Sequence, residues 1–122
     1  MRADHPTPPG GAVPGLLDTR ALDEAVERLA DRLRRLPESR LRQGAAGEGV
    51  RLARRLAALA RRIEGVGPDP AELPAIGVFA VGDQLAVTGH DLSRALRDLG
   101  DAPEAREALA EALGLLRAAR EL

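Results

Sequence analysis

The sequence predicts an all-α protein, an antiparallel four-helix bundle whose helices alternate up and down. In four separate segments, leucine, valine and isoleucine recur every three or four residues, the spacing that places them on one face of a helix. Proline and glycine separate these segments, and residues typical of helix caps lie near their ends. The expected helices span about 19–36, 38–64, 76–99 and 102–121.

The first expected helix, 19–36, has a clear start and a clear stop. Asp18 is suited to be its N-cap, because a carboxylate accepts hydrogen bonds from the free N–H groups of the first turn. Pro37 ends the helix, since it disfavours the α conformation at the residue before it. Two acid–arginine pairs lie four residues apart in the favourable order, namely Glu24 with Arg28 and Asp31 with Arg35.

The second expected helix, 38–64, is well supported only after residue 48. Gly44, Gly47 and Gly49 would each cost about 1 kcal/mol relative to alanine inside a helix. The apolar stripe nevertheless continues back to Leu41, so we expect one helix from about 38. The stretch 65–75, with three prolines and two glycines, is expected to be a loop.

The segment 76–99 admits two interpretations. As a helix it places six apolar residues on one face, Val78, Val81, Leu85, Leu92, Leu96 and Leu99, and Gly100 follows as a stop. The alternative is a β-hairpin formed by 76–81 and 84–88, which the β-branched residues favour. A lone two-stranded hairpin is marginally stable and no other strand is expected here, so we favour the helix.

The last expected helix, 102–121, begins at the motif Asp-Ala-Pro-Glu, in which Asp101 is the expected capping carboxylate and Pro103 an early helical proline. Folding the second and third helices antiparallel about residue 70 sets large residues of one against small residues of the other. The expected pairs are Leu59, Leu56 and Leu52 opposite Gly82, Leu85 and Gly89, and Gly49 and Ala45 opposite Leu92 and Leu96.

The chain is expected to form one domain, 17–122, preceded by a flexible Pro/Gly-rich tail, 1–16. It has no cysteine, which excludes disulfides and thiolate metal sites. It has no run of about 20 apolar residues and no apolar segment typical of a secretory signal, so we expect a cytoplasmic protein without membrane contact. No motif indicates a cofactor.

The apolar arc of the last helix is wider than a bundle core needs. Exposed apolar patches often mark contacts, so this arc and two apolar residues beside the core stripe of 76–99 suggest a protein interface. The candidate interface residues are Phe79, Val87, Leu109, Leu113, Leu115 and Leu116. The expected partner is a protein or a second copy of this chain, as a homodimer.

Two further sets of residues are candidates for other functions. Asp83, His90 and Asp91 are the candidate polar site, where a His–Asp pair could act in acid–base chemistry or bind a small ligand. We expect neither a catalytic residue nor a metal ligand there, because the chain lacks the spacing of three ligands and the sharp turn of a nucleophile. A basic ridge on the second helix could follow phosphates and consists of Arg51, Arg54, Arg55, Arg61 and Arg62.

Two segments, 36–45 (LPESRLRQGA) and 81–92 (VGDQLAVTGHDL), are similar to stretches of small Ala/Arg-rich helical proteins of high-GC actinobacteria. The resemblance implies a bacterial source and carries no activity and no functional residue.

Composition weighs against some of these functions. The net charge of −1 gives no general attraction to nucleic acid. Phe79 is the only aromatic residue, so stacking of bases or sugars has little support. The sequence therefore favours a non-catalytic helical interaction module. The alternatives are a nucleic-acid-associated protein using the basic ridge, and a small-ligand binder or enzyme centred on Asp83 and His90.

Overall fold

The structure is a computed structural model that describes residues 15–65, 76–120 and 122. It confirms an all-α fold with four long helices, which are α1 (Arg20–Arg35), α3 (Ala46–Glu64), α4 (Val81–Leu99) and α5 (Pro103–Ala118). Within the described residues there is no strand, and Val78–Ala80 form a 3₁₀ turn that leads into α4. The hairpin alternative for 76–88 is therefore wrong. The predicted tail and loop lie outside the described part, apart from their last and first residues.

The four long helices surround one apolar core. Helix α4 packs between α1 and α3, and α5 lies on the other side of the molecule, against α1 and α3. The predicted stripe of α1 is buried, as are the leucines of α3 and α4 that face it. In α5 the buried positions are mainly alanines, Ala105, Ala108 and Ala112, which let this helix approach its neighbours closely.

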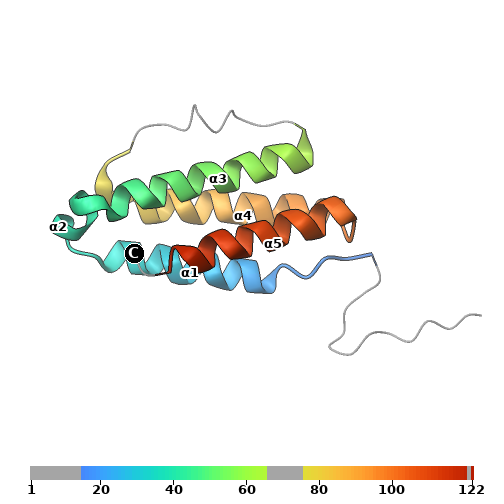
Figure 1. The fold of residues 1–122 in the computed structure, drawn as a ribbon, viewed down its shortest axis with the longest axis horizontal. Coiled ribbons are helices and arrows are strands. Elements are labelled where there is room, and N and C mark those ends of the chain that lie inside the picture. Colours follow the sequence, from blue (N-terminus) through green and yellow to red (C-terminus); the bar gives the residue numbers. More distant parts are fainter. Residues whose placement is uncertain (1–14, 66–75, 121) are drawn as a thin grey trace, which may run out of the picture.

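The predicted up-and-down order is wrong for the consecutive helices α3 and α4, because these two helices run in the same direction. A Cβ added at Gly49, near the start of α3, would lie 2.5 Å from Cγ1 of Val81, at the start of α4. Figure 1 shows both helices running from the α2 end of the bundle to the opposite end, while α1 and α5 run back. Residues 65 and 76 therefore lie at opposite ends.

The glycines of α4 also have a different partner from the one expected. A Cβ at Gly82 would lie 2.7 Å from the backbone oxygen of Ala30, and one at Gly89 would lie 2.5 Å from Cγ1 of Val26. Both glycines face α1, so the predicted contacts of Gly82 and Gly89 with leucines of α3 are wrong. Their absent side chains allow the backbones of α1 and α4 to pack closely.

The helix expected over 38–64 is interrupted near its start. It consists of the short α2 (Glu38–Arg40), a π-helical turn (Leu41–Ala45) and α3. Gly44 has a φ of 139°, which is outside the helical region and is accessible to glycine without strain. The break re-aims the chain while Leu41 remains buried in the core.

Neither of the two expected capping aspartates is the N-cap residue. Helix α1 has Thr19 as its N-cap, and Asp18, one residue earlier, accepts a hydrogen bond from the Arg20 N–H at 3.0 Å. Ala102 is the N-cap of α5, while Asp101 accepts from Arg106 Nη1 at 2.6 Å. In both places an arginine competes with the helix end for the carboxylate.

Candidate functional site

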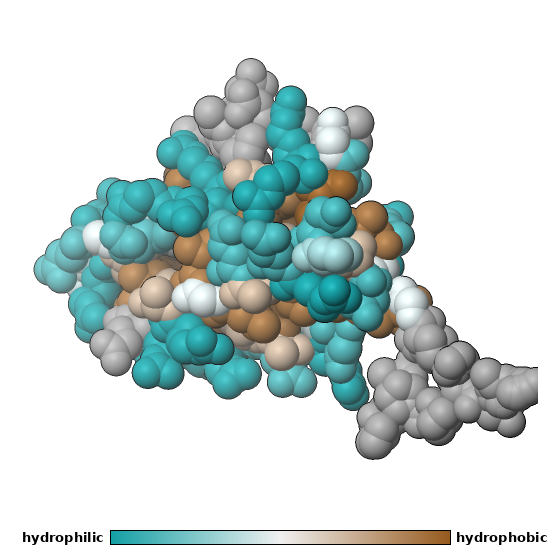
Figure 2. Space-filling view, turned by 45° about the vertical axis from the view of Figure 1, so that its right-hand side comes forward, coloured by the Kyte–Doolittle hydropathy of each residue, from teal (hydrophilic) through white to brown (hydrophobic). Residues whose placement is uncertain are grey.

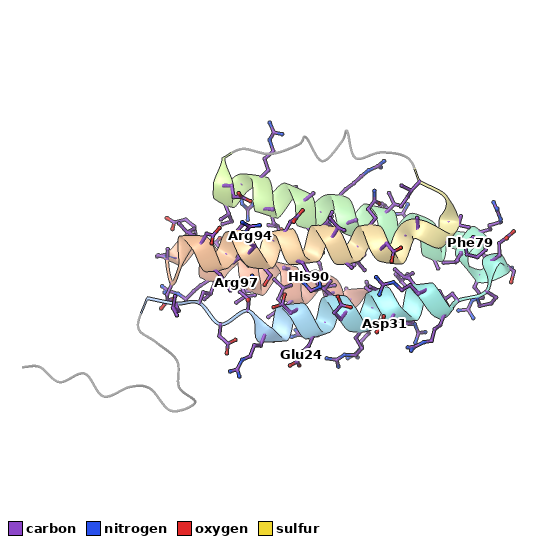
Figure 3. All side chains as sticks on the ribbon, turned by 180° about the vertical axis from the view of Figure 1, so that it is seen from behind. Glu24, Asp31, Phe79, His90, Arg94 and Arg97 are labelled. Carbon is purple, nitrogen blue, oxygen red and sulfur yellow. The ribbon has the colours of Figure 1, made fainter. Side chains whose placement is uncertain are left out.

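The predicted polar site is not assembled as expected, because its members have different partners. His90 lies between two carboxylates of α1, with Nε2 2.5 Å from Glu27 Oε1 and Nδ1 3.3 Å from Asp23 Oδ1. Asp83 accepts a hydrogen bond from Arg34 Nε at 2.9 Å. Asp91 is exposed and has no ion pair with a described residue. Figure 3 shows His90 on α4 where that helix runs beside α1.

A polar cluster that the sequence analysis missed continues this contact toward the start of α1. Ser93 is fully buried, and its hydroxyl donates to Thr19 Oγ1 at 2.9 Å. Arg97 Nη1 donates to Ser93 Oγ at 2.7 Å and lies 3.7 Å from Asp23 Oδ2. Only the small polar residues Thr19 and Ser93 on otherwise apolar faces could have indicated it. A buried and satisfied serine fixes the α1–α4 register.

These contacts favour the protonated form of His90. The hydrogen bond to Glu27, and with smaller weight the one to Asp23, raise the pKa of His90 above its ordinary value of 6.5, against the lowering effect of partial burial. Both ring nitrogens face carboxylate oxygens, so the imidazolium form can donate to both. Among the described residues no group of three or more His, Cys, Asp or Glu is arranged to hold a metal ion.

This arrangement predicts a pH dependence of stability. A folded-state pKa above the unfolded one gives stabilisation that is complete below pH 6.5 and is lost as the pH rises through the folded value. We expect the free energy of unfolding of the wild-type chain to fall more steeply from about pH 6 to about pH 9 than that of His90→Gln. Urea denaturation at constant ionic strength measures both slopes, and parallel curves would contradict the prediction.

The residues predicted to form one interface lie on two sides of the bundle. Phe79, in the 3₁₀ turn before α4, has 64% of its surface exposed, and Val87, in α4, has 61% exposed. On α5, Leu116 is buried, while Leu109, Leu113 and Leu115 are partly buried against the core. Helix α5 is in front in Figure 1 and behind α4 in Figure 3. The predicted single surface is therefore two separate surfaces.

The α5 side contains a groove that the sequence analysis did not predict. It lies between the parallel helices α1 and α5 and has a volume of about 480 Å³. Four apolar residues, Ala25, Leu29, Leu113 and Leu116, and five arginines, Arg28, Arg32, Arg35, Arg117 and Arg120, line it. We call this lining the arginine groove. In Figure 2 brown atoms lie between teal ones on the side that carries α5.

No aspartate or glutamate lines the arginine groove, and four of its five arginines form no ion pair with a described residue. Arg32 Nε donates to the Leu122 backbone oxygen at 2.5 Å. The other four arginines pair with no carboxylate of the described residues. The pairs predicted for Arg28 and Arg35 do not form, since Asp31 binds Arg34 at 2.8 Å instead. Helix α1 thus turns Asp23 and Glu27 toward α4, and Arg28, Arg32 and Arg35 toward α5.

The opposite side of the bundle is rich in carboxylates. We call it the acidic face, and it consists of Asp23, Glu24, Glu27 and Asp31 of α1 with Phe79, Asp83, Val87, Asp91 and Asp98 of the α4 segment. Three arginines also lie there: Arg34, which pairs with Asp83, and Arg94 and Arg97, which are labelled in Figure 3. Glu24, Asp91 and Asp98 form no ion pair with a described residue. Carboxylates therefore outnumber arginines around the two exposed apolar side chains.

The predicted basic ridge on α3 is exposed but partly neutralised. Arg51 pairs with Glu48 on the same helix, and Arg62 lies 3.4 Å from Glu111 of α5. Arg54 and Arg55 are exposed and have no ion pair with a described residue. Arg61 is also exposed. A ridge with two of its arginines bound to glutamates is less suited to following phosphates.

Comparisons with known proteins provide no information about the function of these surfaces. No protein family, no curated protein and no solved structure matches the chain. Within the described residues, no helix is both long and apolar enough to cross a membrane.

Proposed function

We propose that this chain is a non-catalytic helical module of the cytoplasm that binds a protein partner, either another protein or a second copy of itself. The observation that carries the proposal is the exposure of apolar side chains that the fold does not use. Phe79 and Val87 expose about two thirds of their surface, although neither contributes to the core. On α5, at the other side of the bundle, three leucines are only partly buried, Leu109, Leu113 and Leu115. Such surfaces in a small domain are typical of contact sites.

The polar residues support a structural role in preference to catalysis. A nucleophile must reach its substrate, but Ser93 is fully buried and bonded to Thr19 and Arg97. A general base needs a free nitrogen, but both nitrogens of His90 face carboxylates. His90 also does not line the arginine groove. These contacts favour a role in joining α1 to α4.

Site-specific photo-crosslinking in living cells tests the proposal. A benzophenone amino acid is placed at position 87, 113 or 55 in three separate variants, since all three positions reach the surface. We expect covalent adducts with protein from positions 87 and 113, because these residues lie on the proposed contact surfaces. Arg55 is exposed on α3, outside both proposed contact surfaces, and serves as the matched control.

Two results would contradict the proposed function. One is the absence of protein adducts from both 87 and 113. The other is an equal yield of adducts from 55, which would mean that the crosslinks arise from random collision. An adduct of the chain with itself and an adduct with a different protein both agree with the proposal, and mass spectrometry distinguishes them.

A further inference from the structure

The two surfaces on opposite sides of the bundle complement each other in charge and in character. The arginine groove has an apolar floor and four arginines that pair with no carboxylate of the described residues. The acidic face has exposed apolar residues and three carboxylates, Glu24, Asp91 and Asp98, that form no ion pair within the same part of the chain. Helix α1 separates them, with Asp23 and Glu27 toward α4 and with Arg28, Arg32 and Arg35 toward α5 (Figures 1 and 3). One copy cannot bring its own two surfaces together.

From this complementarity we infer that copies of the chain associate head to tail, with the acidic face of one copy docked in the arginine groove of the next. The inference rests on the proposed function and names the partner of the same surfaces. Val87 and Phe79 supply apolar contacts to the groove floor, and Asp91 and Asp98 supply partners for its arginines. Burial of such pairs beside apolar contacts gives both attraction and orientation.

The shape of the arginine groove favours a protein surface as its occupant over a small anion or a nucleic acid. Arg28, Arg32 and Arg35 are spread along two turns of α1, a rise of about 10 Å. A single lipid headgroup or small carboxylate would contact only some of them. A nucleic acid could contact them all, but its outer surface is sugar and phosphate and offers no aliphatic side chains to the leucine and alanine floor. A helix with both carboxylates and apolar residues satisfies both parts of the groove.

Because the two surfaces differ, the contact is heterologous. Each copy keeps one unused acidic face and one unused groove after a first contact, so the assembly grows until it closes as a ring or remains an open chain. Since charged residues take part, the association is expected to weaken as the salt concentration rises.

Two variants, each blocked on one surface, test the inference by light scattering coupled to size-exclusion chromatography. Val87→Arg adds a positive charge and bulk to the acidic face. Arg28→Glu with Arg117→Glu reverses charge in the groove. We expect each variant alone to self-associate at least about tenfold more weakly than the wild type. Mixed together, they should form a 1:1 complex that grows no further, because only one pair of intact surfaces remains.

The matched control is Arg54→Glu with Arg55→Glu, which makes the same change in net charge at exposed positions of α3. This variant should self-associate like the wild type. Circular dichroism must show the same helix content in all variants. A matching loss of association in the control would mean that net charge, and not the groove, governs assembly, and it would overturn the inference.

Three other results would also overturn the inference. They are a wild-type chain that stays monomeric at the highest attainable concentration, unchanged self-association of Val87→Arg, and a mixture that forms no 1:1 complex. None of them by itself removes the proposed function. If crosslinkers at 87 or 113 still join the chain to a different protein, the module binds that protein and the second copy is the wrong occupant.

Discussion

Replacing Gly89 by leucine is expected to lower the free energy of unfolding by about 3 kcal/mol or more, at the upper end of the range for overpacked cores. Even a single methyl group at this position would lie 2.5 Å and 2.6 Å from the two γ carbons of Val26. Valine is stiff about χ1 and cannot turn aside easily. The backbones of α1 and α4 would have to separate. Chemical denaturation followed by circular dichroism measures the loss.

Gly114→Leu is the matched control for this prediction. Gly114 also lies inside a helix, α5, but a Cβ added there meets no atom within 4 Å. The same substitution should therefore raise stability, by up to about 0.8 kcal/mol from helix propensity alone. If the two leucine variants have equal stability, the close packing of α1 on α4 is not what requires glycine at position 89.

Replacing Leu92 by alanine is expected to cost about 2–5 kcal/mol, because the change removes apolar contacts and leaves a cavity. Leu92 is fully buried on α4, the helix that packs between α1 and α3. A loss of this size is a large part of the total stability of a domain this small. A thermal or urea denaturation curve gives the difference directly.

Leu99→Ala provides the comparison for Leu92. Leu99 ends the same helix but keeps 44% of its surface exposed. Its truncation should cost less than about 1 kcal/mol, since little contact area is lost. Similar losses at both positions would mean that burial does not determine the contribution of leucines in α4.

The sequence could predict the helices because their signals are local. Apolar spacing identified the buried residues of α1, and the glycine after α4 marked its end, where Gly100 has a φ of 84°. The glycines before residue 48 weaken the prediction of a helix there, but no pattern within the sequence distinguishes a weak helix from one interrupted at Gly44. A positive φ depends on how the chain must turn to bring Leu41 into the core.

The relative direction of α3 and α4 was not predictable in the same way. An alternation of leucine and glycine fits a partner helix in either direction, so the pattern did not determine which helix each glycine faces. The glycines of α4 face α1, and Gly49 of α3 faces Val81. Helix direction depends on the packing of all four helices together, which no pairwise pattern describes.

The candidate surfaces were predicted only in part. The sequence analysis identified Val87 and Leu113 as surplus apolar residues, but it could not place them on opposite sides of the bundle. The arginine groove combines α1 with α5, which are far apart in the sequence. One signal was available, since Arg28, Arg32 and Arg35 repeat at helical spacing on the side of α1 away from its acidic residues.

Because α3 and α4 run in parallel, the connection between them must span the length of α3, and this sets its minimum length. Gly49 lies against Val81, and Gly65 is sixteen residues further along, a rise of about 24 Å in a helix. From Gly65 to Ile76 the chain has eleven steps, which can reach at most about 40 Å when fully extended. Deleting more than about four residues there would leave the chain too short for this bundle. Insertions would lower the free energy of unfolding by only about 0.6 kcal/mol for each doubling of the loop length. The fold therefore sets a minimum length for this connection but no sharp maximum.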